Sequence, residues 1–543
     1  MIDSSTYRIC RALVSVSDKT ELIPFVRALT EYGIHIISTG GTARELEQGC
    51  IPVAHVTDIT GQKEILDGRV KTLHPKIHAG LLAMRDNPEH MQQLEAAAIQ
   101  PIDMLVGNLY PFEQTLGNAD ATHADIIEHI DIGGPAMIRA AAKNYRWVVV
   151  VTSPHQYAEI LETLRQYHCC VPEDLRLSLA HQAFLHTALY DSVIAQYLGS
   201  IYVQNDRTIE KYRVAQQRES MPQAIALALR KHQDVRYGEN PHQRAALYAE
   251  SGVEYTYDRI VRCIHGKELS YNNMLDIDAA VKLAAEFRTL NTLNKTVVII
   301  KHTNPCGVGS GTTLEEAYKK ALACDTTSAF GGIIALTGSL DEKTARLIDE
   351  LFTEVIIAPH FTPEALELLK QKKNRRLVMV NYDALEAAQR LEMRAIAGGI
   401  LVQTPDKLLW DEQKLKVVTR RAPTDDERRA MEYAWRIAKH VKSNAVVYAA
   451  ADRALAIGAG QMSRVDAASI AVHKAETAGI SLEGSAVASD AFFPFADGLL
   501  EAVKAGATAV IQPGGSVRDN DVIAAANEYS IAMIFTGVRH FRH

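Results

Sequence analysis

The sequence predicts an α/β protein with more than one domain. Short apolar runs alternate with helical patterns along the chain, which is typical of parallel sheets joined by right-handed crossovers. Runs such as Met104–Leu109 and Trp147–Val151 are almost entirely apolar, as expected of strands buried on both faces. The chain has 543 residues, which at about 150 residues per domain corresponds to roughly three or four domains.

Residues 1–200 are predicted to form one three-layer α/β domain. The strands Arg11–Val16 and Ile34–Ser38 precede those named above, and helices are expected over Lys19–Tyr32 and from Ala43 to Gln48. Residues 201–228 are polar and lack this alternation of predicted strands and helices, so we interpret them as a connector.

Two further α/β regions follow, at residues 229–423 and 424–543, and we interpret them as two similar subdomains. The second begins with a long helix around Asp426–His440. The basic run Lys370–Arg376 is predicted to be a solvated loop or helix end, because one short run in an acidic chain is weak evidence for nucleic-acid binding. The expected strands are Thr296–Lys301, Ile333–Leu336, Val355–Ala358, Leu377–Val380, Ala445–Ala450, Ala454–Gly458, Ala509–Gln512 and Ile531–Phe535.

Composition places the chain among globular proteins, with 47% apolar and 23% charged residues. The net charge of −7 argues against a general affinity for nucleic acid or anionic membranes. Seven cysteines without C-x-x-C spacing disfavour zinc-ribbon and disulfide frameworks and fit a reducing compartment. We find no signal-peptide pattern and no apolar run of about 18 residues, so we expect a cytoplasmic protein without a membrane span.

Two loops in the amino-terminal region suit anion binding. Ser17 and Lys19 follow one predicted strand, and Thr39-Gly40-Gly41-Thr42 follows the next and opens a helix. Free N–H groups at a helix start, nearby hydroxyls and glycines let an oxyanion approach. Ordinary capped turns are the alternative for each loop taken alone. Because parallel strands share one crevice at their carboxyl ends, we favour a shared site.

Further polar motifs follow in the same region. The stretch Arg69–Gly80 holds three cations and two imidazoles between glycines, and we favour a loop that faces phosphate or carboxamide. Asn108 and Tyr110 end a buried strand, and the run Asp131–Pro135 follows an apolar one. Lys143 lies farther along the same helical pattern and could equally be a plain surface lysine.

In the second half, Lys301 and His302 end a predicted strand and are placed for proton transfer. Neighbouring strand residues face opposite ways, so both serve one site only if the strand breaks at His302. The residues Thr303–Gly309 are interpreted as the turn that breaks it. A structural histidine is the alternative. The aromatic run Phe492–Phe495 could flank a flat ligand, although a core strand usually explains such residues.

Taken together, these motifs resemble one family. SVSDK, TGGTA, GRVKTLHPKIHAG, NLYPF, DIGGP, RYGENPHQ, KHTNPCG, TSAFGG, KSNAV, GAGQMSR and SDAFFPF occur in this order from about Ser15 to His543. The chain is thus similar to the bifunctional purine-biosynthesis enzymes that join 5-aminoimidazole-4-carboxamide ribonucleotide (AICAR) formyltransferase to IMP cyclohydrolase.

The resemblance implies two reactions. A formyl group passes from the cosubstrate 10-formyltetrahydrofolate to AICAR, giving FAICAR and tetrahydrofolate, and FAICAR then closes with loss of water to IMP. It implies a methylglyoxal-synthase-like parallel-sheet domain for cyclisation, followed by two cytidine-deaminase-like α/β subdomains for formyl transfer. It also implies a homodimer whose transferase sites lie at the interface.

Site residues are implied by the same resemblance. The cyclohydrolase nucleotide would contact Ser17, Lys19, Thr39, Gly40, Gly41, Thr42, Arg69, Thr72, Asn108 and Gly133, with Lys71, Tyr110, Asp131 and Lys143 as catalytic residues. In the transferase, His302 would be the base, Lys301 would stabilise charge and Asn444 would orient the formyl oxygen. AICAR would contact Arg236, Tyr237, Gly331, Glu354, Arg464, Phe492, Asp497, Gly514, Gly515 and Arg539. Glu354 replaces a shorter carboxylate found in some members.

Two other functions are possible on the residues alone. A zinc nucleobase deaminase needs a P-C-x-x-C pair, but Gly309 stands where the second cysteine would follow Cys306, so we expect no catalytic metal. A regulatory nucleotide-binding module would explain the two anion-binding loops but would leave Tyr110 and Lys143 without a functional role.

Overall fold

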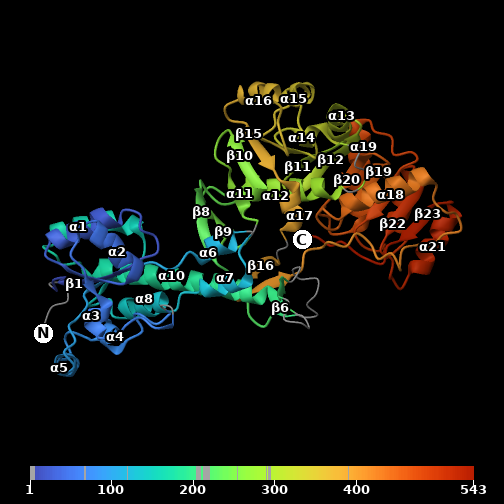
Figure 1. The fold of residues 1–543 in the computed structure, drawn as a ribbon. Helices are drawn as coiled ribbons and strands as arrows, with labels where there is room; N and C mark the ends of the chain where they lie inside the picture. The colour runs from blue at the N-terminus through green and yellow to red at the C-terminus, as the bar shows by residue number, and fades with distance from the viewer. Residues whose placement is uncertain are drawn as a thin grey trace. The chain divides into compact units, whose positions relative to one another are not determined.

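The computed structural model describes residues 7–66, 69–118, 120–203, 209–211, 221–253, 255–288, 290, 295–388 and 391–543. Contacts divide the chain into two compact units (Figure 1). The first unit comprises residues 1–230 and 250–254, and the second comprises residues 231–249 and 255–543.

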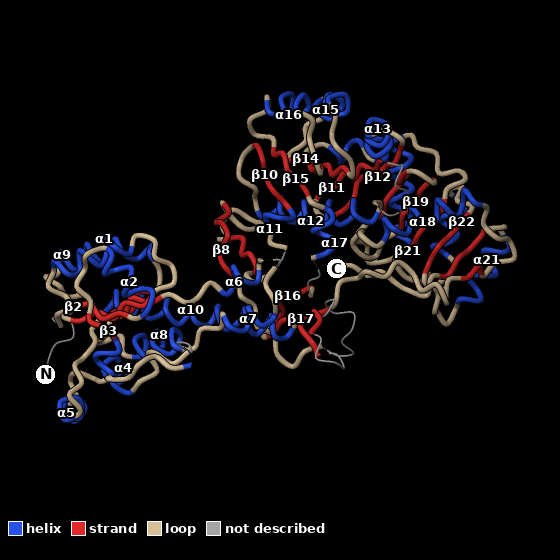
Figure 2. Tube along the Cα trace, viewed as in Figure 1, coloured by secondary structure: helices blue, strands red, loops and turns tan. Residues whose placement is uncertain are grey.

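The first unit is a three-layer α/β fold around a parallel sheet with the order β3-β2-β1-β4-β5. Figure 2 shows α1, α2 and α9 on one face of this sheet and α4 and α8 on the other. Its strands are β1 (Arg11–Ser15), β2 (His35–Ser38), β3 (Ala54–His55), β4 (Met104–Gly107) and β5 (Val149–Val151). Its helices are α1 (Leu22–Glu31), α2 (Gly40–Gln48), α3 (Val56–Thr60), α4 (Pro75–Leu82), α5 (Pro88–Ala96), α6 (Phe112–Leu116), α7 (His123–Glu128), α8 (Gly133–Lys143), α9 (Tyr157–Gln166) and α10 (Glu173–Gly199).

Burial explains why these residues form these elements. All residues of β4 and β5 are buried, which requires a continuous apolar run rather than alternation. In α1 the buried residues are Leu22, Phe25, Val26 and Leu29, the spacing of one helical face. That face packs into a core with the sheet.

The second unit is built on a twelve-stranded sheet with the order β10-β15-β14-β13-β11-β12-β20-β19-β21-β22-β23-β18. Its strands are β10 (Val261–His265), β11 (Lys295–Lys301), β12 (Asn304–Gly311), β13 (Ile333–Leu336), β14 (Val355–Ala358), β15 (Arg376–Val380), β18 (Lys416–Val417), β19 (Val446–Ala450), β20 (Arg453–Gly458), β21 (Ala486–Ser489), β22 (Ala509–Gln512) and β23 (Ala532–Phe535). Its helices are α11 (Tyr257–Ile260), α12 (Tyr271–Glu286), α13 (Leu314–Cys324), α14 (Thr326–Ala329), α15 (Glu342–Asp349), α16 (Pro363–Lys370), α17 (Tyr382–Ala387), α18 (Asp425–Ala438), α19 (Arg464–Ala478), α20 (Asp497–Lys504) and α21 (Asp519–Glu528).

The two halves of this sheet share one topology. The hairpin β11–β12 is followed by β13, which is antiparallel to β11, and then by the parallel strands β14 and β15. The hairpin β19–β20 is followed in the same way by β21, β22 and β23. β12 pairs antiparallel with β20, so the halves form one sheet.

Alternate residues of the central strands serve opposite cores. Val298 and Ile300 of β11 pack in the core that contains α12 and α18, whereas Val297 and Ile299 pack in the core that contains α13. Both faces of β11 are therefore covered, which accounts for its unbroken apolar sequence.

Three short pairs of strands lie outside these two larger sheets. Hairpins form between β6 (Ile201–Val203) and β7 (Ile209–Lys211), and between β16 (Glu392–Ile396) and β17 (Gly399–Gln403). The strands β8 (Leu229–Val235) and β9 (Ala245–Glu250) form another two-stranded sheet. The predicted connector holds β6 and β7, and its residues 204–208 and 212–220 lie outside the described part of the chain.

The interpretation of Lys370–Arg376 was partly wrong. Lys370 does end a helix, α16, but Arg375 and Arg376 are buried. Arg375 pairs with Asp349, and Arg376 begins β15 and lies 3.7 Å from Glu354. Two partly buried carboxylates thus lie beside three of the five cations in the run, because Asp349 also pairs with Lys372 at 2.9 Å.

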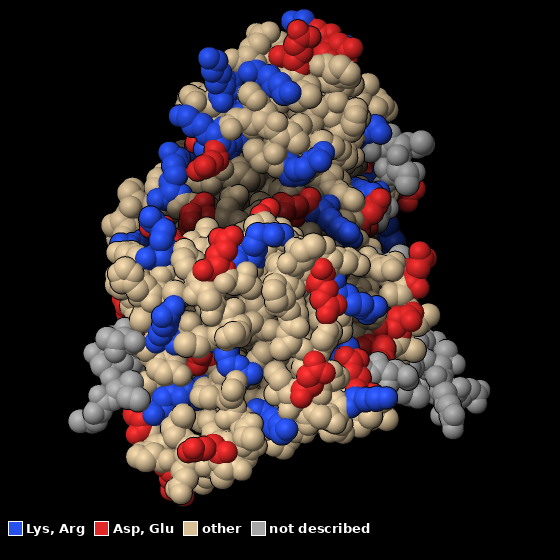
Figure 3. Space-filling view, turned by 60° about the vertical axis from the view of Figure 1, so that its left-hand side comes forward, with Lys and Arg blue, Asp and Glu red and all other residues tan. Residues whose placement is uncertain are grey.

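On the face drawn in Figure 3, positive and negative side chains are interspersed over the described residues. None of the described helices has the length and apolarity that a membrane crossing would require.

Candidate active sites

Three loops of the first unit meet at the carboxyl edge of its sheet, after β1, β2 and β4. Asn108, which follows β4, accepts hydrogen bonds at Oδ1 from the N–H groups of Ser17 (2.6 Å) and Asp18 (2.8 Å). Its Nδ2 donates to the Asp18 carbonyl at 3.0 Å. The Asn108 side chain therefore holds the loop after β1 in place.

The second loop opens α2. The Oγ1 atom of Thr42 donates to the Val16 carbonyl at 3.0 Å, which fixes the loop against β1. Thr39 makes no side-chain cap on α2. Gly40 has φ of +42°, and a Cβ atom there would stand 3.4 Å from the Lys71 ammonium. The loop thus brings backbone and cation close enough to share an anion.

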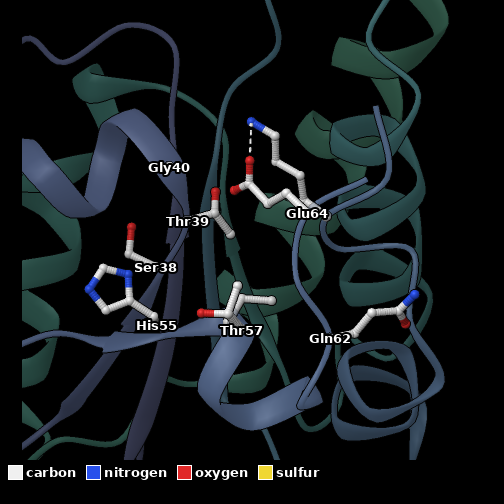
Figure 4. Close-up of a pocket in the computed structure, with 9 residues that line it drawn as sticks. Ser38, Thr39, Gly40, His55, Thr57, Gln62 and Glu64 are labelled. Carbon is white, nitrogen blue, oxygen red and sulfur yellow. Dashed lines mark ion pairs between the residues drawn. The ribbon is translucent and has the colours of Figure 1, made fainter. Parts of the chain in front are cut away.

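A pocket lies beside this loop (Figure 4). Within it, Glu64 Oε2 stands 3.7 Å from Lys71 Nζ, the ion pair that Figure 4 draws as a dashed line. Glu64 has no motif that would have identified it from the sequence. The lining residues are Ser38, Thr39, Gly40, His55, Val56, Thr57, Gln62, Glu64 and Lys71.

Asp131 lies near the same cation. Burial raises the pKa of this carboxyl, and the N–H groups of Gly134 (2.8 Å) and Tyr110, with the charge of Lys71, partly offset that effect. The Asp131 N–H donates to the hydroxyl of Tyr190 at 2.8 Å. Tyr190 is buried on α10, far along the chain, and only the fold could show its position. The Tyr110 backbone and the Lys71 charge thus both lie near the Asp131 carboxyl.

The remaining predicted residues of this unit contact different partners. A Cβ atom on Gly133 would lie 2.9 Å from Thr72 Oγ1, so these two residues pack closely. Lys19 pairs with Glu45 at 3.3 Å, and Arg69 pairs with Glu128.

Lys143 is exposed at the carboxyl end of α8. Eleven residues of helix put this end about 15 Å from the end nearest Asp131, at about 1.5 Å per residue. The structure does not bring Lys143 together with the other three catalytic candidates.

In the second unit, β11 ends at Lys301 and β12 begins at Asn304. His302 and Thr303 form the turn, with φ of +53° and +61°. The prediction that the strand breaks at His302 is confirmed. Lys301 Nζ donates to the Phe330 carbonyl at 2.8 Å, next to Gly331, while the His302 side chain is exposed.

The interpretation of Thr303–Gly309 as a turn was wrong beyond Thr303. The residues from Asn304 onward form β12, which is buried from its second residue. A Cβ atom on Gly307 or Gly309 would collide with the backbone of α13, so the glycines permit close helix packing. Burial raises the pKa of the Cys306 thiol to about 12, as for a structural cysteine.

The amino-terminal half of α12 supplies polar groups that the sequence analysis missed. Asn273 Nδ2 donates to Glu354 Oε2 at 3.0 Å. One turn later, Asp276 Oδ1 accepts from the Thr303 N–H at 2.6 Å. The Ser270-x-x-Asn273 capping box was the available signal for the start of this helix.

Glu354 also joins two predicted substrate ligands. Burial and the charge of Arg236 lower the pKa of Arg376, whereas Glu354 raises it. The Arg236 guanidinium stands 5.5 Å from the ring of Tyr237. Arg236, Tyr237, Glu354 and Arg376 therefore share one place in the fold.

The second half of the sheet carries Asn444. Its Nδ2 donates to the carbonyls of Gln461 (2.9 Å) and Met462 (3.0 Å). Both N–H bonds are used, so Oδ1 remains as an acceptor. The peptide bond between Ser443 and Asn444 is cis. Nearby, Asn304 Oδ1 accepts from the Lys442 N–H at 3.0 Å, which ties this segment to the turn formed by His302 and Thr303.

A buried carboxylate lies beneath that segment. Asp490 Oδ2 accepts from Ser443 Oγ at 2.6 Å, and Oδ1 lies 3.9 Å from Arg464. Burial raises the pKa of Asp490. The guanidinium of Arg464 faces the rings of Phe492 (5.9 Å) and Phe541 (5.8 Å), so one cation connects several predicted contacts.

The aromatic run divides between core and surface. Phe493 is buried, whereas Phe495 lies 4.7 Å from the Arg518 guanidinium.

The other predicted contacts of this half lie on separate elements. Asp497 begins α20. The Gly515 N–H donates to Asp519 at 2.7 Å. Gly514 and Gly515 both have positive φ, and Arg539 stands 4.6 Å from the ring of Phe541.

Strand register places these groups at one edge of the sheet. Ile300 pairs with Ile333, Ile333 with Val355, and Val355 with Arg376, so Lys301, Gly331 and Glu354 share that edge. Val446 pairs with Ser489 in the other half, which puts Asn444 and Asp490 at a common edge too.

Comparison with known proteins gives two family matches. Residues 141–474 match the AICARFT/IMPCHase bienzyme family, and residues 21–136 match the MGS-like domain. Three relatives are each described as "Bifunctional purine biosynthesis protein PurH". The Chloroflexus aurantiacus protein is 53% identical over 99% of both chains. The Chelativorans protein is 52% identical over 98% of this chain and 97% of that one, and a Bacillus cereus protein is 48% identical over 98% and 99%.

Proposed function

Since the chain belongs to the AICARFT/IMPCHase bienzyme family of bifunctional purine-biosynthesis enzymes, we propose how its parts divide the last two steps of IMP synthesis. Residues 1–200 close FAICAR to IMP, residues 229–423 and 424–543 transfer the formyl group, and residues 201–228 connect them. The observation that carries this proposal is the full-length similarity to PurH proteins.

In cyclisation, an amide nitrogen attacks the formyl carbon and water leaves. The loops around Ser17 and Thr39–Thr42 bind the phosphate, where the free N–H groups at the start of α2 favour an anion. Lys71 polarises the formyl oxygen, and Tyr110 and Asp131 exchange protons with the attacking nitrogen and the leaving oxygen. The raised pKa of Asp131 suits a group that both accepts and returns a proton.

In formyl transfer, His302 removes a proton from the AICAR amine, which is a weak nucleophile because it is conjugated to the ring. Lys301 stabilises charge as the folate nitrogen leaves. Asn444 offers an acceptor oxygen, so it orients the amine N–H rather than the formyl oxygen. Arg236, Tyr237, Gly331, Glu354, Arg464, Phe492, Asp497, Gly514, Gly515 and Arg539 surround AICAR.

The cosubstrate we propose is 10-formyltetrahydrofolate, and we propose a cytoplasmic homodimer. We expect no catalytic zinc, because Gly309 replaces the cysteine that would complete a P-C-x-x-C pair, and because Cys306 points into a core rather than a site.

The test supplies purified protein with AICAR and 10-formyltetrahydrofolate and follows tetrahydrofolate, FAICAR and IMP by chromatography. We expect IMP and tetrahydrofolate in equal amounts. His302→Ala should lose formyl transfer but still convert supplied FAICAR to IMP, and Lys71→Ala should do the reverse. Loss of both activities in either folded variant would contradict the two-site assignment, and deamination of AICAR would revive the deaminase hypothesis.

A further inference from the structure

The turn between β11 and β12 has an unusual backbone for its sequence. Lys301 pairs with Asn304, which leaves His302 and Thr303 as a two-residue hairpin loop, and both have positive φ. Hairpin loops of this kind favour Asn, Asp or Gly, because other residues pay a steric penalty in the left-handed region. A contact from outside the hairpin must therefore hold the turn.

Asp276 supplies that contact. Its Oδ1 accepts the Thr303 N–H at 2.6 Å, and its carboxyl group also accepts the N–H of His302. Asp276 stands on α12, which packs against β11. One side chain thus binds both N–H groups of the turn from a rigid helix.

The imidazole depends on this turn for its position. The side chain of His302 is exposed, so surrounding packing does little to fix it, and its place follows from the backbone that carries it.

We propose that Asp276 is a positioning residue for formyl transfer, holding the left-handed turn so that His302 meets the amine of AICAR. The inference rests on the proposed role of His302 as the base. Asn273 lies one turn earlier on α12 and holds Glu354, so the same helix end arranges the base and a predicted substrate contact.

The first experiment compares Asp276→Ala with Asp278→Ala. Asp278 is exposed on the same helix and pairs with Lys282 at 2.8 Å, so its loss is a matched control. For Asp276→Ala we expect the kcat of formyl transfer to fall on the order of 10²-fold, as for a misplaced catalytic group, with little change in the KM for AICAR. Asp278→Ala should match the wild type, and conversion of FAICAR to IMP should be unchanged in both.

The second experiment is a rescue. Glycine adopts positive φ without the steric penalty, so Asp276→Ala combined with Thr303→Gly should regain at least about tenfold of the lost kcat. If Asp276→Ala does not fold, Asp276→Asn, which keeps one acceptor oxygen, takes its place with the same rescue.

A wild-type kcat for the Asp276 variant, or no gain on adding Thr303→Gly, would overturn the inference while His302→Ala stays inactive. Formyl transfer by His302→Ala would instead overturn the proposed function, whatever the Asp276 variants do.

Discussion

Replacing Glu286 with Gln should destabilise the second unit severely. Glu286 ends α12, and its Oε1 lies 2.6 Å from the ammonium of Lys439, which follows α18. The side chains are 19% and 4% exposed. Breaking a buried pair by removing one partner costs about 3–5 kcal/mol, because the other charge stays buried and uncompensated. We expect the free energy of unfolding to fall by that amount.

The assay is urea unfolding followed by hydrogen exchange with mass spectrometry, since peptides from α18 report on the second unit separately from the first. Glu342→Gln is the control, because Glu342 pairs with Arg346 on α15 of the same unit and the two side chains are 44% and 65% exposed. It should cost at most about 1 kcal/mol. A loss below about 1 kcal/mol for Glu286→Gln would refute the reasoning that the pair is effectively desolvated.

The same cluster predicts acid lability. Burial raises the pKa of Glu286, but the hydrogen bonds and charges of His440 and Lys439 outweigh burial and lower the pKa to about 2. A carboxyl with a depressed pKa contributes stability above its ordinary value of 4.5 and loses it as the pH falls toward 2. Burial lowers the pKa of His440 from 6.5, so its contribution declines below pH 6.5. The unfolding free energy should therefore fall from about pH 6.5 downward, and Glu286→Gln should flatten the part below pH 4.5.

Three further predictions concern single residues. Gly307→Ala should lower the stability of the second unit by about 1–3 kcal/mol through overpacking against α13, whereas Gly399→Ala, with no atom closer than 3.9 Å to the new Cβ, should be near neutral in the same urea assay. Lys143→Ala should slow FAICAR cyclisation less than Lys71→Ala does, because α8 keeps Lys143 away from the site; an equal loss would mean that Lys143 reaches it by another route. Glu64→Gln should tighten IMP binding about fivefold, as measured by calorimetry. The reason is that the Glu64 carboxylate would repel the IMP phosphate by about 1 kcal/mol if the two charges lay about 4 Å apart. Weaker binding would show instead that Glu64 helps to hold the nucleotide.

Much of the fold could be predicted because buried strands reveal themselves locally. Ile333–Leu336 and Val355–Ala358 were predicted with the bounds that the structure has, since strands covered on both faces need unbroken apolar runs. β12 was missed because its sequence, NPCGVGSG, carries glycines that a neighbouring helix demands. Because these glycines are required by the packing of α13 against β12, the β12 sequence lacks the alternating or continuous apolar pattern by which a strand is recognised.

The candidate sites were predicted unevenly for a related reason. Motifs identified Asp131 and His302, but the side chains that bind the backbone at Asp131 and at the turn of His302 and Thr303 come from distant parts of the chain. Asp276 precedes the turn it holds by 27 residues, and Tyr190 reaches Asp131 across 59 residues. Neither has a neighbouring motif, so only the fold brings them to the site.

Topology explains why strand ends alone could not locate the transferase site that we propose. β12 and β20 pair antiparallel, so the second half of the sheet is inverted relative to the first. At the edge that carries His302, β13 and β14 therefore begin, whereas β21 and β22 end. Glu354 precedes its strand while Asp490 follows one. At the site that we propose, the rule that ligands bind at the carboxyl ends of parallel strands is therefore met in one half of the sheet and reversed in the other, and the two halves contribute chemically different groups.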